Sequence, residues 1–159
     1  MQISIVCVGK VKEKFYRDAL AEYGKRLGRY TKFSVVEVSD EKTPDHPTEV
    51  EKEQILSKEA DRILSKISDK TYVIALAIEG KRPDSVELAH HLQQLMLSGK
   101  SNLAFVIGGS LGLHPDVIRR SDEQLSFSAM TFPHQLMRVI LAEQIYRSFR
   151  IISGEPYHK

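Results

Sequence analysis

The sequence predicts an α/β protein with a mostly parallel sheet of five to six strands and helices on both faces. Two observations predict this class. Strand-like and helix-like hydrophobic periods alternate along the chain, and the run 71–78 is apolar throughout, as in a strand that is covered on both faces. The 159 residues are enough for one domain, so we expect residues 1–159 to fold as a single unit.

Two strands that flank a helix are expected at the start of the chain. Residues 1–8 and 32–38 have strand character. Between them, apolar side chains recur every four residues and mark one face of a helix: Phe15, Ala19, Tyr23 and Leu27. Residues 1–8 lack the basic leader and the length of a signal peptide. The single cysteine, Cys7, excludes an internal disulfide and is expected to be a small buried side chain.

A capped helix and a buried strand are expected next. After a turn-rich loop at 40–47, Thr48 and Glu51 have the spacing of a capping box, which predicts that a helix starts there. Its buried stripe is expected to consist of Leu56, Ala60, Ile63, Leu64 and Ile67. The strand 71–78 follows this helix.

The same capping pattern predicts a third helix. Asp84 and Glu87 have the capping spacing, and the helix is expected to end at Ser98-Gly99. Its inward residues are Leu88, Leu92 and Leu95. The runs 103–107 and 124–127 complete about five strands.

Residues 134–152 are expected to form the last helix, with an apolar surface too wide for a helix that faces solvent. At 100° per residue, one narrow stripe is charged and consists of Glu143, Arg147 and Arg150. The remaining surface is largely apolar: Leu136, Val139, Ile140, Leu141, Ala142, Ile145, Tyr146 and Phe149. We therefore expect a homodimer, in which a second subunit covers this helix. The alternative is a monomer in which it is the most buried helix.

The charges are unevenly distributed along the chain. The net charge is only +2, but residues 1–30 hold seven Lys or Arg against three acids, a local balance of 7 − 3 = +4. Residues 37–53 hold seven acids against two lysines. The first segment is either a solvated helix face or a basic shoulder for phosphate groups. With 42% hydrophobic residues and no apolar run near the ~20 residues that span a bilayer, we expect a cytoplasmic protein without membrane contact.

Two segments place ligand-suited residues directly after strands. Residues 103–112 run from a strand into Gly108-Gly-Ser-Leu-Gly112, where missing β-carbons expose backbone N–H groups. Residues 126–134 place Ser, Thr and Pro in the same position. The glycines match neither the dinucleotide nor the phosphate-loop fingerprint, and no metal site is expected because no cluster has ligand spacing. Residue chemistry alone predicts a pocket for a small, partly apolar, nucleoside-like ligand between two strand ends.

Arg138 falls within the apolar arc of the last helix, where an unpaired guanidinium would be costly. It is expected to have a partner. That partner is either an acid of the same chain or a substrate phosphate or developing negative charge. His134, at the helix start, is interpreted by default as a capping or packing histidine.

The chain resembles the RlmH family in four segments: LAFVIGGSLGL at 103–113, LSFSAMTFPHQLMR at 125–138, the continuation VILAEQIYRSFRI, and the closing Pro-Tyr-His-Lys. The first thirty residues are similar too, so the likeness covers the whole chain. The resemblance implies the SPOUT fold with a C-terminal trefoil knot. It also implies an S-adenosylmethionine-dependent methyltransferase that modifies N3 of a pseudouridine in large-subunit ribosomal RNA, within the ribosome.

The resemblance also implies site residues. The cofactor S-adenosylmethionine would contact Leu76 in the strand 71–78, Gly108 after the next strand, and the run Phe127, Ser128, Ala129, Met130, Thr131 and Phe132. Arg138 would stabilise or anchor the anion of the base. The tail residues Tyr157, His158 and Lys159 would act on the substrate side, with His158 a candidate proton acceptor. In the dimer, the tail of one subunit would lie beside the cofactor of the other.

Two other functions stay open from the sequence. A non-catalytic RNA- or ribosome-binding protein could have the same fold. A small-molecule enzyme that uses a dinucleotide is disfavoured by the absent fingerprint.

Overall fold

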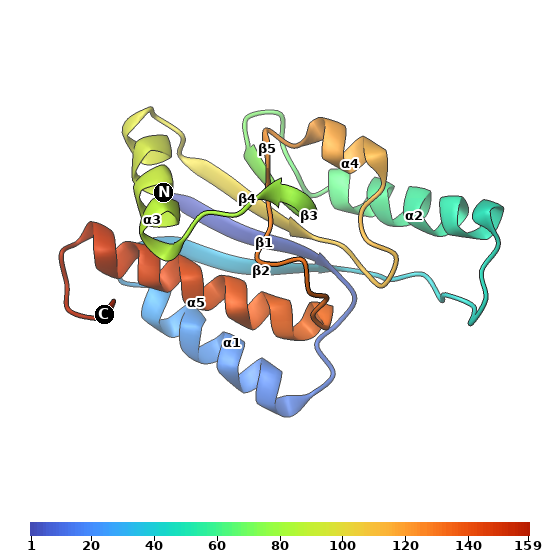
Figure 1. The fold of residues 1–159 in the computed structure, drawn as a ribbon, viewed down its shortest axis with the longest axis horizontal. Helices are drawn as coiled ribbons and strands as arrows, with labels where there is room; N and C mark the ends of the chain where they lie inside the picture. The colour runs from blue at the N-terminus through green and yellow to red at the C-terminus, as the bar shows by residue number, and fades with distance from the viewer.

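The computed structural model describes all 159 residues and confirms the predicted α/β class. Its sheet contains five parallel strands in the order β2-β1-β4-β3-β5 (Figure 1). The strands are β1 Gln2–Val8, β2 Lys32–Val38, β3 Tyr72–Lys81, β4 Asn102–Ile107 and β5 Glu123–Leu125. The helices are α1 Lys14–Leu27, α2 Glu49–Leu64, α3 Ser85–Leu97, α4 Pro115–Arg120 and α5 His134–Ile152.

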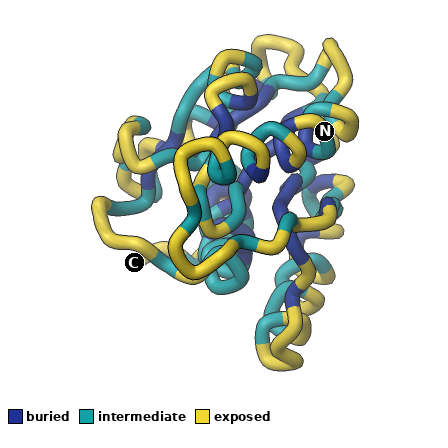
Figure 2. The backbone as a smooth tube through the Cα atoms, turned by 90° about the vertical axis from the view of Figure 1, so that its right-hand side faces the viewer, coloured by how far each residue is buried: buried dark blue, intermediate teal, exposed yellow.

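Helices cover both faces of the sheet, as the sequence predicts. Helices α1, α3 and α5 lie on one face (Figure 1). There, side chains of β1 and β4 such as Ile5 and Phe105 pack against them. On the other face, Val6 and Val106 pack against α2 and α4. The alternation of neighbouring residues between the two cores follows from the period of two in a strand. Exposed positions lie on the loops and on the outer faces of the helices (Figure 2).

The predicted caps are present and explain where two helices begin. Thr48 accepts a hydrogen bond from the backbone N–H of Glu51, and the Glu51 side chain accepts one from the Thr48 N–H. Asp84 and Glu87 make the same reciprocal pair at α3. Each box satisfies backbone donors that the first helical turn leaves unpaired.

Two details of packing differ from the prediction. Phe15 is 63% exposed, because the residues of α1 that pack against the core lie further along the helix, at Leu20, Tyr23 and Leu27. In α2 the buried stripe includes Ile55 and Glu59 rather than Leu56. Glu59 accepts a hydrogen bond from the Glu41 N–H, and burial raises the pKa of its carboxyl group.

Strand bounds and one helix also differ. The strand β3 continues beyond the predicted run 71–78, to Lys81. Only Val73, Ile74 and Ala75 of this strand are buried, so the run is not covered on both faces throughout. The last strand is Glu123–Leu125 instead of 124–127. The short helix α4 was not predicted, although His114 caps it and Pro115 occupies its first position, both ordinary start signals.

The strand order brings the ligand-suited segments to one edge. Since all strands are parallel, their carboxyl ends meet at the same edge of the sheet. The chain leaves β4 at Gly108, between the ends of β1 and β3. It leaves β5 at Ser126, beside β3. None of the helices has both the length and the hydropathy that crossing a bilayer requires.

Candidate active site

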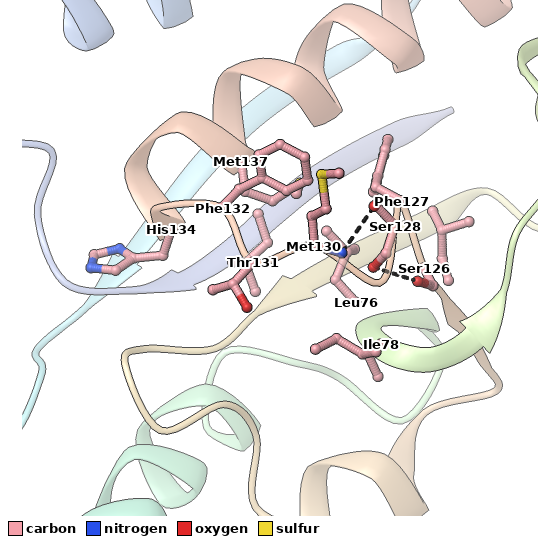
Figure 3. Close-up of a pocket in the computed structure, with 13 residues that line it drawn as sticks. Leu76, Ile78, Ser126, Phe127, Ser128, Met130, Thr131, Phe132, His134 and Met137 are labelled. Atoms are coloured by element: carbon pink, nitrogen blue, oxygen red, sulfur yellow. Dashed lines mark hydrogen bonds between the residues drawn. The ribbon is translucent and has the colours of Figure 1, made fainter.

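A pocket lies at the carboxyl edge of the sheet, between the end of β3, the chain after β5 and the start of α5. Nine of its 13 lining residues are hydrophobic. The 13 lining residues are Leu76, Ala77 and Ile78 of β3, Ile107 of β4, Leu125 of β5, Ser126 to Ser128 and Met130 to Phe132 after β5, and His134 and Met137 of α5 (Figure 3). Pockets of this kind, at the ends of parallel strands, are the usual ligand sites of α/β folds.

Two of the wall residues leave large apolar surfaces open to solvent. Ile78 is 52% exposed and Met130 is 74% exposed, and both side chains lie at the pocket in Figure 3. Exposed apolar groups that converge on one hollow are typical of a binding surface rather than of an ordinary protein surface. The pocket therefore offers apolar contact to a bound molecule.

The loop after β5 also offers unpaired hydrogen-bond donors. The backbone N–H of Met130 donates to Ser128 Oγ at 3.0 Å, and Ser126 Oγ donates to the Ser128 carbonyl at 3.3 Å. The other N–H groups of the loop have no acceptor in the chain: Phe127, Ser128, Ala129, Thr131 and Phe132. Unpaired N–H groups beside a hollow suit a ligand with nitrogen and oxygen acceptors.

The pocket gathers most of the residues expected at the cofactor. Six of them line it: Leu76, Phe127, Ser128, Met130, Thr131 and Phe132. Gly108 directly follows the lining residue Ile107, and Ala129 lies within the lining loop. The sequence did not assign the other seven lining residues to the cofactor: Ala77, Ile78, Ile107, Leu125, Ser126, His134 and Met137. Their only signal was their place in or near the segments that carry the named residues.

Gly108 is required by a close backbone approach. A β-carbon there would lie 2.4 Å from the Gly112 carbonyl oxygen and 2.6 Å from its carbon. Gly112, in contrast, has nothing within 4 Å of a β-carbon, although its φ of +84° favours glycine.

We expect Gly108→Ala to weaken ligand binding at the pocket at least tenfold, because Gly112 must move and the loop with it. Gly99→Ala is the matched control, since Gly99 has a φ of +89°, open space around it and a position far from the pocket at the end of α3. Calorimetric titration of both variants checks this. Equal binding by the Gly108 and Gly99 variants would contradict it.

Arg138 is fully buried and has partners within the chain. Its guanidinium donates to Glu37 Oε2 at 2.9 Å and to the Val8 carbonyl at 2.7 Å. It also lies 3.2 Å from His134 Nδ1, and its Nε has no partner. The acid of the same chain, one of the two alternatives from the sequence, is therefore present, and the role of Arg138 in the chemistry stays a prediction.

The tail packs on the outer side of α5, at the end opposite to the pocket. The Tyr157 hydroxyl donates to Glu143, which raises the pKa of Tyr157 to about 12. The Arg147 guanidinium lies 4.6 Å from the centre of the Tyr157 ring and 3.1 Å from His158 Nδ1. Lys159 is exposed. Within one chain the structure does not bring these tail residues to the pocket.

The fold and the site define a class, an α/β protein with an apolar ligand pocket at the carboxyl edge of a parallel sheet. The chain belongs to the SPOUT methyltransferase family, whose model, described as "Predicted SPOUT methyltransferase", matches residues 1–158. Relatives from Lysinibacillus sphaericus and Bifidobacterium adolescentis, both described as "Ribosomal RNA large subunit methyltransferase H", are each 58% identical over the full length of both chains.

Solved structures agree in fold. A probable methyltransferase from Bordetella pertussis Tohama I superposes with a TM-score of 0.58 at 16% identity, over 92% of this chain and 95% of that one. A probable methylase family protein from Haemophilus influenzae Rd KW20 gives a TM-score of 0.54 at 16% identity, over 99% of this chain and 70% of that one. The resemblance seen in the sequence is thus confirmed at the level of the family, and the trefoil knot stays a prediction.

Proposed function

We propose that this chain is an S-adenosylmethionine-dependent methyltransferase that modifies N3 of a pseudouridine in large-subunit ribosomal RNA. The observation that carries the proposal is the apolar pocket with its unpaired N–H groups, in a chain of the SPOUT methyltransferase family. The names of its relatives from Lysinibacillus sphaericus and Bifidobacterium adolescentis support ribosomal RNA as the substrate. The ribosome also places the proposed reaction in the cytoplasm.

The pocket suits S-adenosylmethionine. Leu76, Met130 and Phe132 supply apolar walls for an adenine ring, and the free N–H groups of the loop after β5 supply donors for its ring nitrogens and for ribose oxygens. Gly108 keeps the neighbouring wall free of side-chain atoms. When bound, the cofactor supplies an electrophilic methyl group on a sulfonium.

The residues of the chain then have two tasks. They must hold N3 of the base in line with the methyl group, and they must remove the N3 proton and stabilise the anion that results. Arg138 is buried at the start of α5, next to the pocket residues His134 and Met137, and stabilises the anion through its positive field. His158 is the candidate that accepts the proton, because an imidazole can take up a proton near neutral pH.

The separation of pocket and tail supports a homodimer. His134 at the pocket and Arg147 at the tail lie about 20 Å apart along α5, at 1.5 Å rise per residue. A partner that packs antiparallel on α5 would bring its own tail to this pocket. The first half of α5 carries three apolar residues that are only half-buried: Leu136, Val139 and Ile140. Such a partner would cover them.

In solution we expect a particle of about 36 kDa, twice the 18.1 kDa of one chain. A charge in the apolar stripe, Val139→Asp, is expected to shift the mass to that of one chain. Val50→Asp is the control, since Val50 is 67% exposed on α2. Light scattering at micromolar concentration measures both, and a monomeric wild type would contradict the dimer.

The function itself is tested by transfer of labelled methyl groups from S-adenosylmethionine to ribosomes, to separated subunits and to free ribosomal RNA. We expect incorporation into the large-subunit RNA of assembled ribosomes, at a nucleotide that mass spectrometry identifies as N3-methylated pseudouridine. Binding to ribosomes without any incorporation would instead favour a non-catalytic RNA-binding protein of this fold.

A further inference from the structure

A second hollow adjoins the candidate active site, at the carboxyl ends of β1 and β2. We name it the β1–β2 cleft, and it is lined by Gly9, Lys10, Lys12, Glu37, Val38, Ser39, Asp40, His134 and Gln135. His134 is the one residue that lines both this cleft and the pocket. In Figure 3 its imidazole lies at the end of the pocket, turned away from Leu76 and Ile78. A molecule in the cleft and a molecule in the pocket would therefore meet at His134.

Buried partners fix the orientation and tautomer of His134. Arg138 Nη2 lies 3.2 Å from His134 Nδ1, and a guanidinium can only donate, so Nδ1 accepts and the ring proton is on Nε2. Arg138 is itself held by Glu37 and by the Val8 carbonyl. His134 Nε2 has no partner in the chain and is not buried. His134 therefore presents an N–H donor to solvent, and its side chain does not cap α5.

The surroundings keep this donor uncharged. Burial and the nearby Arg138 guanidinium lower the pKa of His134. Of the other charges that face it, Asp40 raises this pKa and Lys12 lowers it. Because the result lies below the ordinary value of 6.5, the imidazole is neutral at pH 7 and above.

We propose that the β1–β2 cleft receives the target nucleotide and that His134 donates from Nε2 to a carbonyl oxygen of its base. This inference rests on the proposed function. In a uracil-type base N3 lies between two carbonyls, and loss of the N3 proton spreads negative charge onto both oxygens. A fixed N–H donor at one oxygen stabilises that anion more than the neutral base. The exposed side chains of Lys10 and Lys12 lie at the cleft, where they suit the neighbouring phosphates.

Two replacements of His134 separate the donor from the shape of the side chain. His134→Phe keeps a planar ring but removes the donor, and we expect its methyl transfer to ribosomes to fall about 30- to 300-fold. His134→Gln keeps an amide N–H at a similar reach and is expected to recover activity to within about tenfold of wild type. Both variants are expected to bind S-adenosylmethionine within about threefold of wild type, since His134 lines only one end of the pocket.

The pH profile distinguishes a donor from a base. A neutral donor does not titrate between pH 7 and 9, so the loss in His134→Phe is expected to be constant over that range. His90→Phe is the matched control, because His90 is exposed on α3 and lies outside both hollows. Thermal unfolding of each variant checks that it is folded.

The outcomes separate this inference from the proposed function. A wild type that transfers no methyl group to ribosomes overturns the proposed function and the inference with it. If the wild type is active, any of three results overturns the inference and leaves the proposed function intact. The His134→Phe variant keeps wild-type activity, the Phe and Gln variants lose activity equally, or cofactor binding falls in parallel with methyl transfer.

Discussion

Arg138→Ala is expected to lose methyl transfer and about 3 kcal/mol of the free energy of unfolding, while it keeps cofactor binding. The side chain is fully buried, and its removal takes a donor from the Val8 carbonyl and the charged partner from Glu37, which keeps only the Val11 N–H as a donor. We choose the lower end of the usual range for a broken buried ion pair because the Glu37 side chain is 37% exposed and water can reach it. Urea unfolding at pH 7 and calorimetric titration with S-adenosylmethionine measure the two quantities.

A double replacement serves as the control for Arg138. In Arg138→Met with Glu37→Gln neither charge remains, so part of the lost stability is expected to return while methyl transfer does not. A stable but inactive double variant would show that Arg138 serves the reaction, through its positive charge or through its hold on His134. Loss of cofactor binding in both variants would instead assign Arg138 to the support of the pocket.

His158→Ala is expected to lower methyl transfer about 10²- to 10⁴-fold, the range for removal of a general base, with unchanged cofactor binding. His158 contacts only the exposed side of α5 through Arg147, so the replacement leaves the core intact. His46→Ala is the matched control, since His46 is also exposed and lies in the loop between β2 and α2. The rates come from the ribosome assay with saturating S-adenosylmethionine.

Mixing two impaired variants tests which subunit supplies the tail, at an S-adenosylmethionine concentration that saturates the wild type but leaves Gly108→Ala largely unbound. A heterodimer of Gly108→Ala and His158→Ala chains has one site with an intact pocket and an intact tail only if each tail serves the partner's pocket. Random exchange of subunits makes about half of the dimers mixed, so about a quarter of the wild-type activity is expected to return. No recovery in the mixture would place pocket and tail of each site in the same chain.

The alternation of hydrophobic periods was sufficient to predict the layers of the fold. The capping boxes at Thr48 and Asp84 located two helices because the same spacing that satisfies their first N–H groups is visible in the sequence. The exposure of Ile78 could not be predicted, because an apolar residue in a strand has the same pattern whether a helix or a pocket faces it. The bounds of β5 could not be predicted either, because the strand has only three residues and its hydrophobic pattern does not show where it ends.

The site was predicted in its composition but not in its arrangement. The glycines after β4 and the Ser- and Thr-rich run after β5 pointed to the correct edge of the sheet, since both directly follow strands. The contact of Arg138 with Glu37 and Val8 joins residues 101 and 130 positions apart, and no local pattern contains it. The orientation of His134 depends on that contact and was equally invisible.

The order of the strands affects how the chain can acquire its structure during synthesis. The first strand pairs with β4, whose residues come a hundred positions later, and the guanidinium that binds Val8 belongs to the last helix. Pairing across such sequence separations is slow, because a long loop must close before any contact forms. We therefore expect a nascent chain to leave its amino-terminal half only partly ordered until translation is almost complete, and to mature late, over milliseconds to seconds after release.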